Sequence, residues 1–257
     1  LDKRIFPWNH ANCGDLNLSG ERRPQSYLRE TLWSDAPVSH IVVTPPVPSF
    51  PLNPDKADWS VWDFPDVVDH WNFPGYEGKK MTVSVYSNCE QVELFLNGES
   101  LGKQENTADK KNTLVWEVPY AHGILKAVSY NKGGEVGTAT LESAGKVEKI
   151  RLSADRTEIV ADGNDLSYIT LELVDSKGIR NQLAEELVEF SIEGDATIEG
   201  VGNANPMSIE SFVANSRKTW RGSNLLVVRS GKSSGRIIVT AKVKALPVAS
   251  ITITQKK

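Results

Sequence analysis

The sequence predicts an all-β chain of two immunoglobulin-like β-sandwich domains, preceded by a short segment of loop and helix. Period-two alternation of apolar and polar residues recurs in both later regions, with turn signals at the spacing typical of such sandwiches. Helical periodicity is prominent only near the N-terminus. The 257 residues, 39% of them hydrophobic, suffice for two domains with ordinary cores. We therefore expect three segments, with boundaries at 1–35, 36–145 and 146–257.

The first segment, residues 1–35, is expected to contain one short amphipathic helix. Pro24 suits the first turn of a helix, and one face of the following stretch carries Tyr27, Leu28, Thr31 and Leu32. A lone helix of this length cannot bury its own apolar face. We therefore expect it either to be weakly ordered or to dock on the next domain through Leu28, Leu32 and Trp33.

The second segment opens with a proline-rich stretch, residues 44–51, which disfavours both helix and central strand and predicts an extended connector. The Asn97-Gly98 pair between two extended runs predicts a hairpin. Residues 131–134 predict a second turn. The expected strands cover residues 81–86, 92–96, 113–118, 124–130 and 135–141.

The third segment repeats this style without being an obvious sequence repeat of the second. Asp162-Gly163-Asn164-Asp165 predicts a turn, because the ligand alternation and closing glutamate of a calcium loop are absent. The expected strands cover residues 150–153, 157–160, 168–175, 188–192, 225–229, 236–242 and 249–254.

Composition excludes several classes of function. The formal net charge of -4, with mixed signs, provides no basic stripe for nucleic acid. The histidines are scattered, and none lies at metal-ligand spacing from another or from a cysteine, so we expect no metal and no cofactor. No apolar run approaches the length of a membrane span. Cys13 and Cys89 are expected to be buried thiols rather than a disulfide.

The tryptophans are candidates for binding. Trp59, Trp62 and Trp71 lie close together in sequence and could form a platform on which the apolar face of a sugar stacks. They could instead seal a domain against its neighbour, which buries the same area without a ligand. Trp116 alternates with strand residues and is expected in a core.

Three stretches carry a resemblance to glycoside hydrolase family 2, in its β-galactosidase-like branch. Residues 13–33, from Cys13-Gly14-Asp15-Leu16 onward, look like the last loop and helix of that family's catalytic (β/α)8 barrel. Residues 86–102 are similar to the hairpin of the sandwich that follows the barrel. Residues 161–168, with 212–215, resemble the additional C-terminal immunoglobulin-like domain of the bacterial, invasin-like type. Residues 1–35 would then be a remnant of the barrel.

The resemblance implies a bacterial retaining β-glycosidase that uses two glutamates, but neither glutamate motif has a counterpart in this sequence. Acidic residues here fall mostly on solvated strand faces or in turns, so we expect no catalytic residue and no activity from this chain alone. Asp15 is the exception in its loop position, and a loop-fixing role is favoured for it. The implied role is to brace the upstream catalytic barrel of the same polypeptide.

Further expectations follow from the same resemblance. Because the loop before the last helix lies at the catalytic face of a barrel enzyme, Trp8, His10 and Asn12 are expected to line the sugar site of the intact enzyme. The alternative function is a carbohydrate-binding module that engages galactose-containing glycans through exposed tryptophans. The partners would be the barrel, its oligosaccharide substrate and possible further copies in a homo-oligomer. The intact protein is expected to be periplasmic or secreted.

Overall fold

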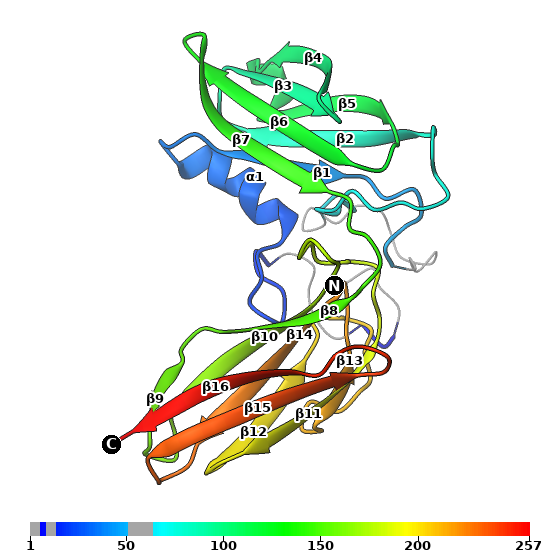
Figure 1. Cartoon of the computed structure of the whole chain (residues 1–257). Coiled ribbons are helices and arrows are strands. Elements are labelled where there is room, and N and C mark those ends of the chain that lie inside the picture. Colours follow the sequence, from blue (N-terminus) through cyan, green and yellow to red (C-terminus); the bar gives the residue numbers. More distant parts are fainter. Residues whose placement is uncertain (1–5, 9–13, 51–63) are drawn as a thin grey trace. The chain divides into compact units, whose positions relative to one another are not determined.

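The computed structural model describes residues 6–8, 14–50 and 64–257. The chain divides into two compact units, residues 1–143 and 144–257, and each is a sandwich of two sheets (Figure 1). The all-β class is therefore confirmed. The helix of the expected first segment lies within the first of these two units.

The first unit pairs a three-stranded sheet, in the order β1-β2-β5, with a four-stranded sheet, in the order β4-β3-β6-β7. Burial alternates along β3 and β5, as expected where one face of a sheet covers the core. The elements are α1 (Pro24–Trp33), β1 (Ser39–Val43), β2 (Lys80–Ser87), β3 (Gln91–Leu96), β4 (Glu99–Glu105), the 3₁₀ turn Ala108–Lys110, β5 (Thr113–Pro119), β6 (Ile124–Asn131) and β7 (Gly134–Glu142).

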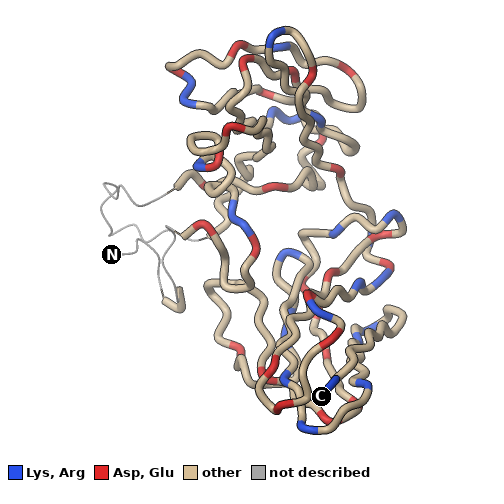
Figure 2. Tube along the Cα trace, turned by 90° about the vertical axis from the view of Figure 1, so that its left-hand side faces the viewer, with Lys and Arg blue, Asp and Glu red and all other residues tan. Residues whose placement is uncertain are grey.

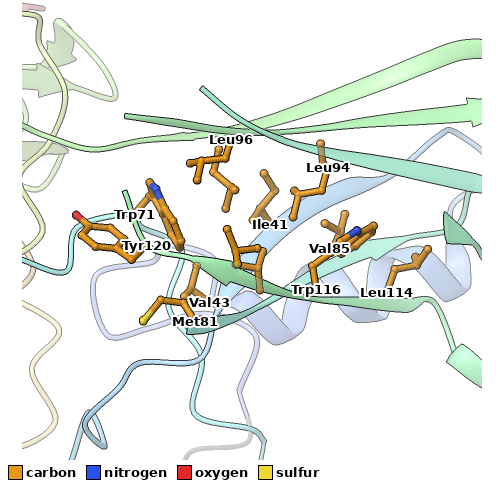
Figure 3. Packing of buried hydrophobic residues seen from close by; sticks show 14 of the residues in the cluster. Ile41, Val43, Trp71, Met81, Val85, Leu94, Leu96, Leu114, Trp116 and Tyr120 are labelled. Atoms are coloured by element: carbon orange, nitrogen blue, oxygen red, sulfur yellow. The ribbon is translucent and has the colours of Figure 1, made fainter. Parts of the chain in front are cut away.

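Trp71 is one of the largest side chains in the first core, and none of its surface is exposed (Figure 3). Its ring meets Phe73 and Tyr120 edge-on, with centroid separations of 6.0 and 4.9 Å. The indole Nε1 donates to the carbonyl of Ala121 at 2.9 Å, so the polar edge of the ring is satisfied inside the core. Trp116, on β5, is also buried, as its alternating position predicts.

The Asn97-Gly98 hairpin is confirmed between β3 and β4. Both residues have positive φ, 52° and 86°, which is the backbone that a tight two-residue hairpin requires. The Asn97 side chain also accepts from the backbone N–H of Ile124 at 2.7 Å. The turn therefore anchors the start of β6 as well as joining β3 to β4.

The second unit pairs a four-stranded sheet, β12-β14-β10-β8, with a five-stranded sheet, β13-β11-β15-β16-β9. All its pairings are antiparallel except that of β9 with β16. The elements are β8 (Lys149–Ala154), β9 (Glu158–Val160), β10 (Leu166–Val174), β11 (Leu187–Glu193), β12 (Ala196–Gly202), β13 (Ser216–Lys218), β14 (Ser223–Ser230), β15 (Gly235–Val243) and β16 (Ala249–Lys256).

Three observed strands, β1, β12 and β13, were predicted neither as strands nor as an arm of the hairpin, each for a physical reason. The residues of β1 end in a run of three consecutive buried apolar side chains, so no alternation marks it. A register shift between Ile198 and Gly200 interrupts β12. β13 has only three residues, too few for a period to show.

Replacing Trp71 by Ala should destabilise the first unit by about 3–5 kcal/mol, since it empties a fully buried aromatic site. Trp33 is a matched control, because its side chain is 84% exposed in the same unit. Trp33→Ala in the isolated chain should change the free energy of unfolding by at most about 0.5 kcal/mol. Urea unfolding of both variants measures the difference. Equal losses would contradict the burial of Trp71 described above.

Candidate functional site

The predicted sugar-facing residues fall in different surroundings. His10, Asn12, Trp59 and Trp62 lie outside the described residues. Trp8 is half-buried, and its ring meets that of Phe50 edge-on at 5.0 Å. The sugar-stacking hypothesis is wrong for Trp71, because a ring with no exposed surface has no face to offer a sugar.

Helix α1 is fixed to the first sandwich by a stack of three side chains. The rings of Tyr27 on α1 and His40 on β1 are nearly parallel, at 7°, with centroids 3.6 Å apart. The guanidinium of Arg22 covers Tyr27 at 3.9 Å from the ring centroid. Arg22 also forms a 2.6 Å ion pair with Glu30 on α1. The phenol ring thus lies in contact with both a cation and an imidazole.

Two asparagines from strand connections hold the C-terminal end of the helix. Asn112, before β5, donates from Nδ2 to the Thr31 hydroxyl at 3.0 Å. Asn88, between β2 and β3, donates to the carbonyls of Ser34 and Ala36, both at 2.9 Å, and accepts from the N–H of Val38 at 2.8 Å. Sequence patterns did not predict these contacts, because each joins residues 50 or more positions apart.

The loop before α1 is held by local polar contacts. Asn17 Oδ1 accepts from the backbone N–H groups of Ser19 and Glu21, at 2.9 and 3.0 Å. Asp15 forms an ion pair with Arg29 on the helix. This contact is the loop-fixing role that the sequence favoured for Asp15.

Two large apolar side chains at the C-terminal end of α1 remain exposed. The predicted docking on the next sandwich is observed, but its proposed residues are wrong: Leu32 is 65% exposed and Trp33 is 84% exposed, while Leu28 is only partly buried. The helix residues that are buried are instead Pro24, Gln25, Ser26 and Thr31. Docking through Tyr27 and these buried residues leaves Leu32 and Trp33 facing solvent.

Burial lowers the pKa of His40 from 6.5 to about 4, and the charge of Arg22 acts in the same direction. The nearby carboxylates of Asp69 and Glu30 oppose this shift. The imidazole Nε2 is buried without a hydrogen-bond partner in the described structure. His40 is therefore neutral where α1 is docked, and protonation opposes docking.

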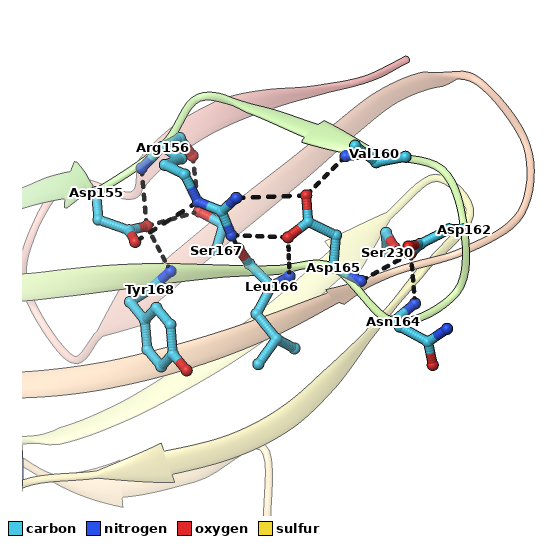
Figure 4. Close-up of polar contacts among 10 residues, drawn as sticks. All are labelled: Asp155, Arg156, Val160, Asp162, Asn164, Asp165, Leu166, Ser167, Tyr168 and Ser230. Atoms are coloured by element: carbon cyan, nitrogen blue, oxygen red, sulfur yellow. Dashed lines mark hydrogen bonds and ion pairs between the residues drawn. The ribbon is translucent and has the colours of Figure 1, made fainter. Parts of the chain in front are cut away.

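The second unit contains a network of carboxylates at one end of its sheets (Figure 4). Asp165 accepts from Arg156 and from the N–H of Val160, both at 2.8 Å. Asp162 accepts from the N–H groups of Asn164 and Asp165 at 2.7 and 2.9 Å, which confirms the predicted turn. These backbone donors hold the pKa of both carboxyls below the ordinary value. The network acts as a structural cap for the strand ends.

Strand carboxylates that the sequence placed on solvated faces are paired with other side chains. Glu172 contacts Arg151 at 2.7 Å and Arg180 at 3.6 Å. Glu93 accepts from the hydroxyl of Ser100 at 2.6 Å. Across the described residues, positive and negative charges are interspersed along the trace (Figure 2). These contacts assign structural roles to both carboxylates.

One hollow in the second unit has a volume of about 700 Å³. Its charged lining residues include both lysine and glutamate, and its lining contains no aromatic ring on which a sugar could stack. The lining residues are Lys146, Val147, Glu148, Asn181, Leu183, Ala184, Glu186, Val243, Lys244, Ala245 and Leu246.

Within the described residues, no group of three or more His, Cys, Asp or Glu side chains lies where it could hold a metal ion. In the same part of the chain, α1 is not long and apolar enough to cross a membrane. Cys89 is buried as a free thiol, as predicted, whereas Cys13 lies outside the described residues.

The neutrality of His40 predicts a pH dependence of folding. Its folded pKa of about 4 lies below the ordinary 6.5, so the unfolded chain binds the proton more tightly. The contribution of neutral His40 to the free energy of unfolding is complete above about pH 6.5, falls as the pH drops, and is lost below about pH 4. The total loss is about 3 kcal/mol.

His40→Phe keeps a ring against Tyr27 and should remove this part of the pH dependence, while His122→Phe, at an exposed position, should retain it. Urea unfolding between pH 7 and pH 4 measures the slopes. Identical slopes for wild type and His40→Phe would show that His40 titrates normally.

The comparisons with known proteins give a consistent result. Residues 150–252 match the model "Glycoside hydrolase family 2 C-terminal domain 5", and residues 78–137 match a domain of unknown function, DUF4982. The β-galactosidase BoGH2A of Bacteroides ovatus is 30% identical over 98% of this chain and 26% of its own length. A β-glucuronidase of Formosa agariphila is 30% identical over 77% of this chain and 20% of its own length.

A solved structure agrees with these relatives. The crystal structure of a glycosyl hydrolase family 2 member from Bacteroides cellulosilyticus is 96% identical, with a TM-score of 0.91, over 95% of this chain and 32% of that one. The chain thus spans between a fifth and a third of the length of these proteins. The chain belongs to glycoside hydrolase family 2 and corresponds to a C-terminal part of the proteins in that family.

Proposed function

We propose that this chain braces the catalytic barrel of a larger family 2 glycosidase and supplies no catalytic group itself. The observation that supports this proposal is the exposure of Leu32 and Trp33 on helix α1, which is itself docked on the first sandwich. In this proposal the exposed face packs on the barrel of the same polypeptide.

The energetics favour a covered face. Burial of one large apolar side chain contributes roughly 1.5–3 kcal/mol, so Leu32 and Trp33 together offer a substantial gain. Leu16 and Leu18, in the loop before the helix, are also exposed, at 57% and 49%. An apolar surface beside a rigid polar anchor is typical of a protein contact.

The proposed parent activity is hydrolysis of terminal β-glycosidic bonds with retention, by two glutamates in the part of the protein outside this chain. The relatives are named a β-galactosidase and a β-glucuronidase, so these two glycosides are the first substrates to test. We propose Trp8, with His10 and Asn12, as the part of this chain that lines the sugar site. A periplasmic or secreted location and assembly into a homo-oligomer also remain proposals.

The bracing proposal is tested in the full-length protein with the double variant Leu32→Ser/Trp33→Ser. It should lower the stability of the full-length protein by roughly 2–4 kcal/mol, because it removes two buried apolar contacts. In the isolated 257-residue chain the same change should be nearly neutral, since both side chains are exposed there.

Ile124→Ser/Val136→Ser is the matched control, with exposures of 43% and 39% in the same unit. Thermal and urea unfolding of the full-length protein and the isolated chain provide the comparison. An equally small effect of Leu32→Ser/Trp33→Ser in both proteins would exclude α1 as the bracing contact.

The sugar-site proposal is tested with Trp8→Ala and Trp8→Phe in the full-length enzyme. On an aryl β-galactoside or aryl β-glucuronide, whichever is hydrolysed, Trp8→Ala should reduce kcat/KM about tenfold or more, through loss of an aromatic contact with sugar. Trp8→Phe should recover part of the loss. Unchanged kinetics for Trp8→Ala would remove Trp8 from the site and leave the bracing role unaffected.

A further inference from the structure

The loop between β12 and β13, residues 203–215, presents apolar side chains to solvent. Ile209 is 81% exposed, Val213 is 82% exposed and Phe212 is 49% exposed. The second core is built without them, from residues such as Leu171, Phe190, Leu226 and Ile237. Their exposure is therefore not a gap in the packing of the sandwich.

A buried arginine fixes this loop from beneath. Arg217, on β13, is fully buried. Its Nη1 donates to the carbonyls of Val201 and Glu210, both at 3.2 Å, and its Nη2 donates to the Ser208 hydroxyl at 3.1 Å. Its guanidinium lies 4.2 Å from the centroid of the Phe212 ring. Burial lowers the pKa of Arg217, and the charge of Glu210 partly offsets this effect.

Further contacts close the loop onto the sheet. Glu210 accepts from the backbone N–H of Lys218 at 3.0 Å and from the Ser208 hydroxyl, also at 3.0 Å. The carbonyl of Phe212 accepts from the N–H of Val201, on β12, at 2.8 Å. Both sides of the loop are thus tied to neighbouring strands. Ile209 and Val213 are held outward by a hydrogen-bonded base.

The chemistry of this tip suits an apolar protein surface. Phe212 is its one aromatic residue, and Arg217 covers one face of that ring, so the tip lacks the set of free aromatic faces on which sugars usually stack. Between residues 209 and 213 the only charged residue is Glu210, whose carboxylate is used within the loop. The partner surface that complements residues 209–213 is therefore an uncharged, apolar depression.

The small area of this exposed apolar surface indicates what kind of partner covers it. Since even a fully buried aromatic side chain contributes about 150–250 Å², these three partly exposed side chains contribute on the order of 400 Å². A stable complex between separate proteins buries about 800 Å² on each partner. A contact within one polypeptide needs less, because the covalent link supplies an effective concentration of roughly millimolar.

We propose that residues 209–213 form an apolar knob that docks the second unit on the part of the same polypeptide outside this chain. This inference rests on the proposed bracing role and adds a second contact to it, in the other unit. The knob and α1 use different residues, so either contact can fail alone.

Hydrogen exchange tests the knob in the full-length protein and in the isolated 257-residue chain. Amides 207–213 should exchange at least fivefold more slowly in the full-length protein. Ile209→Ser/Val213→Ser should abolish that difference and leave the isolated chain unchanged. The control Val160→Ser/Val248→Ser, at positions 51% and 57% exposed in the same unit, should preserve it.

Three outcomes would overturn the knob. The first is equal exchange in the two wild-type proteins, and the second is protection that survives Ile209→Ser/Val213→Ser. The third is protection that increases with protein concentration, which would assign the surface to a second copy. If Leu32→Ser/Trp33→Ser still destabilises the full-length protein in any of these cases, the bracing role stands without the knob.

Arg217→Lys tests the base of the loop independently. It retains the charge but loses the planar set of donors that reaches two carbonyls and a hydroxyl. Amides 207–213 should then exchange several-fold faster in the isolated chain, whereas amides of β15 should not change. An unaltered loop in this variant would show that Arg217 does not hold the knob, and would remove the rigid base on which the proposal depends.

Discussion

The stacking of Tyr27 on His40 fixes which face of α1 lies against the first sandwich. It places an aromatic face of α1 on β1 and requires a neutral imidazole, whose pKa burial lowers to about 4. With this face fixed, Asn88 and Asn112 hold the end of the helix and the chain that leaves it. The remaining faces of α1 are then available to another surface. The exposure of Leu32 and Trp33 follows from this arrangement.

The same physical arrangement recurs in the second unit. Arg22 covers Tyr27 in the first unit, and Arg217 covers Phe212 in the second. In both places a hydrogen-bonded cation supports an aromatic ring, and large apolar side chains nearby point to solvent. This inverts the usual order of a small domain, in which apolar groups anchor a segment and polar groups face water. Segments anchored in this way can keep their shape before a partner covers them.

Local patterns predicted most of the fold. Alternation identified the long strands, and Asn97-Gly98 identified the hairpin, because both signals depend on neighbouring residues alone. The manner of helix docking was not predictable, since Asn112 and Thr31 meet across 81 positions of sequence. Arg217 and Lys218 are adjacent basic residues, yet one is fully buried and the other exposed. Only the strand pairing distinguishes them.

Trp71 and Trp33 show that the sequence also did not predict which aromatic side chains are exposed for binding. Both are tryptophans in the first unit, but the sequence favoured Trp71 as a sugar-stacking candidate and Trp33 as a residue through which the helix docks. The core encloses Trp71, while polar docking of α1 leaves Trp33 outside. A strand carboxylate such as Glu172 is likewise paired with arginines rather than placed opposite a second acid. In the proposed bracing role, the exposed apolar positions of this chain, rather than its acids, are where the full-length protein should respond to substitution.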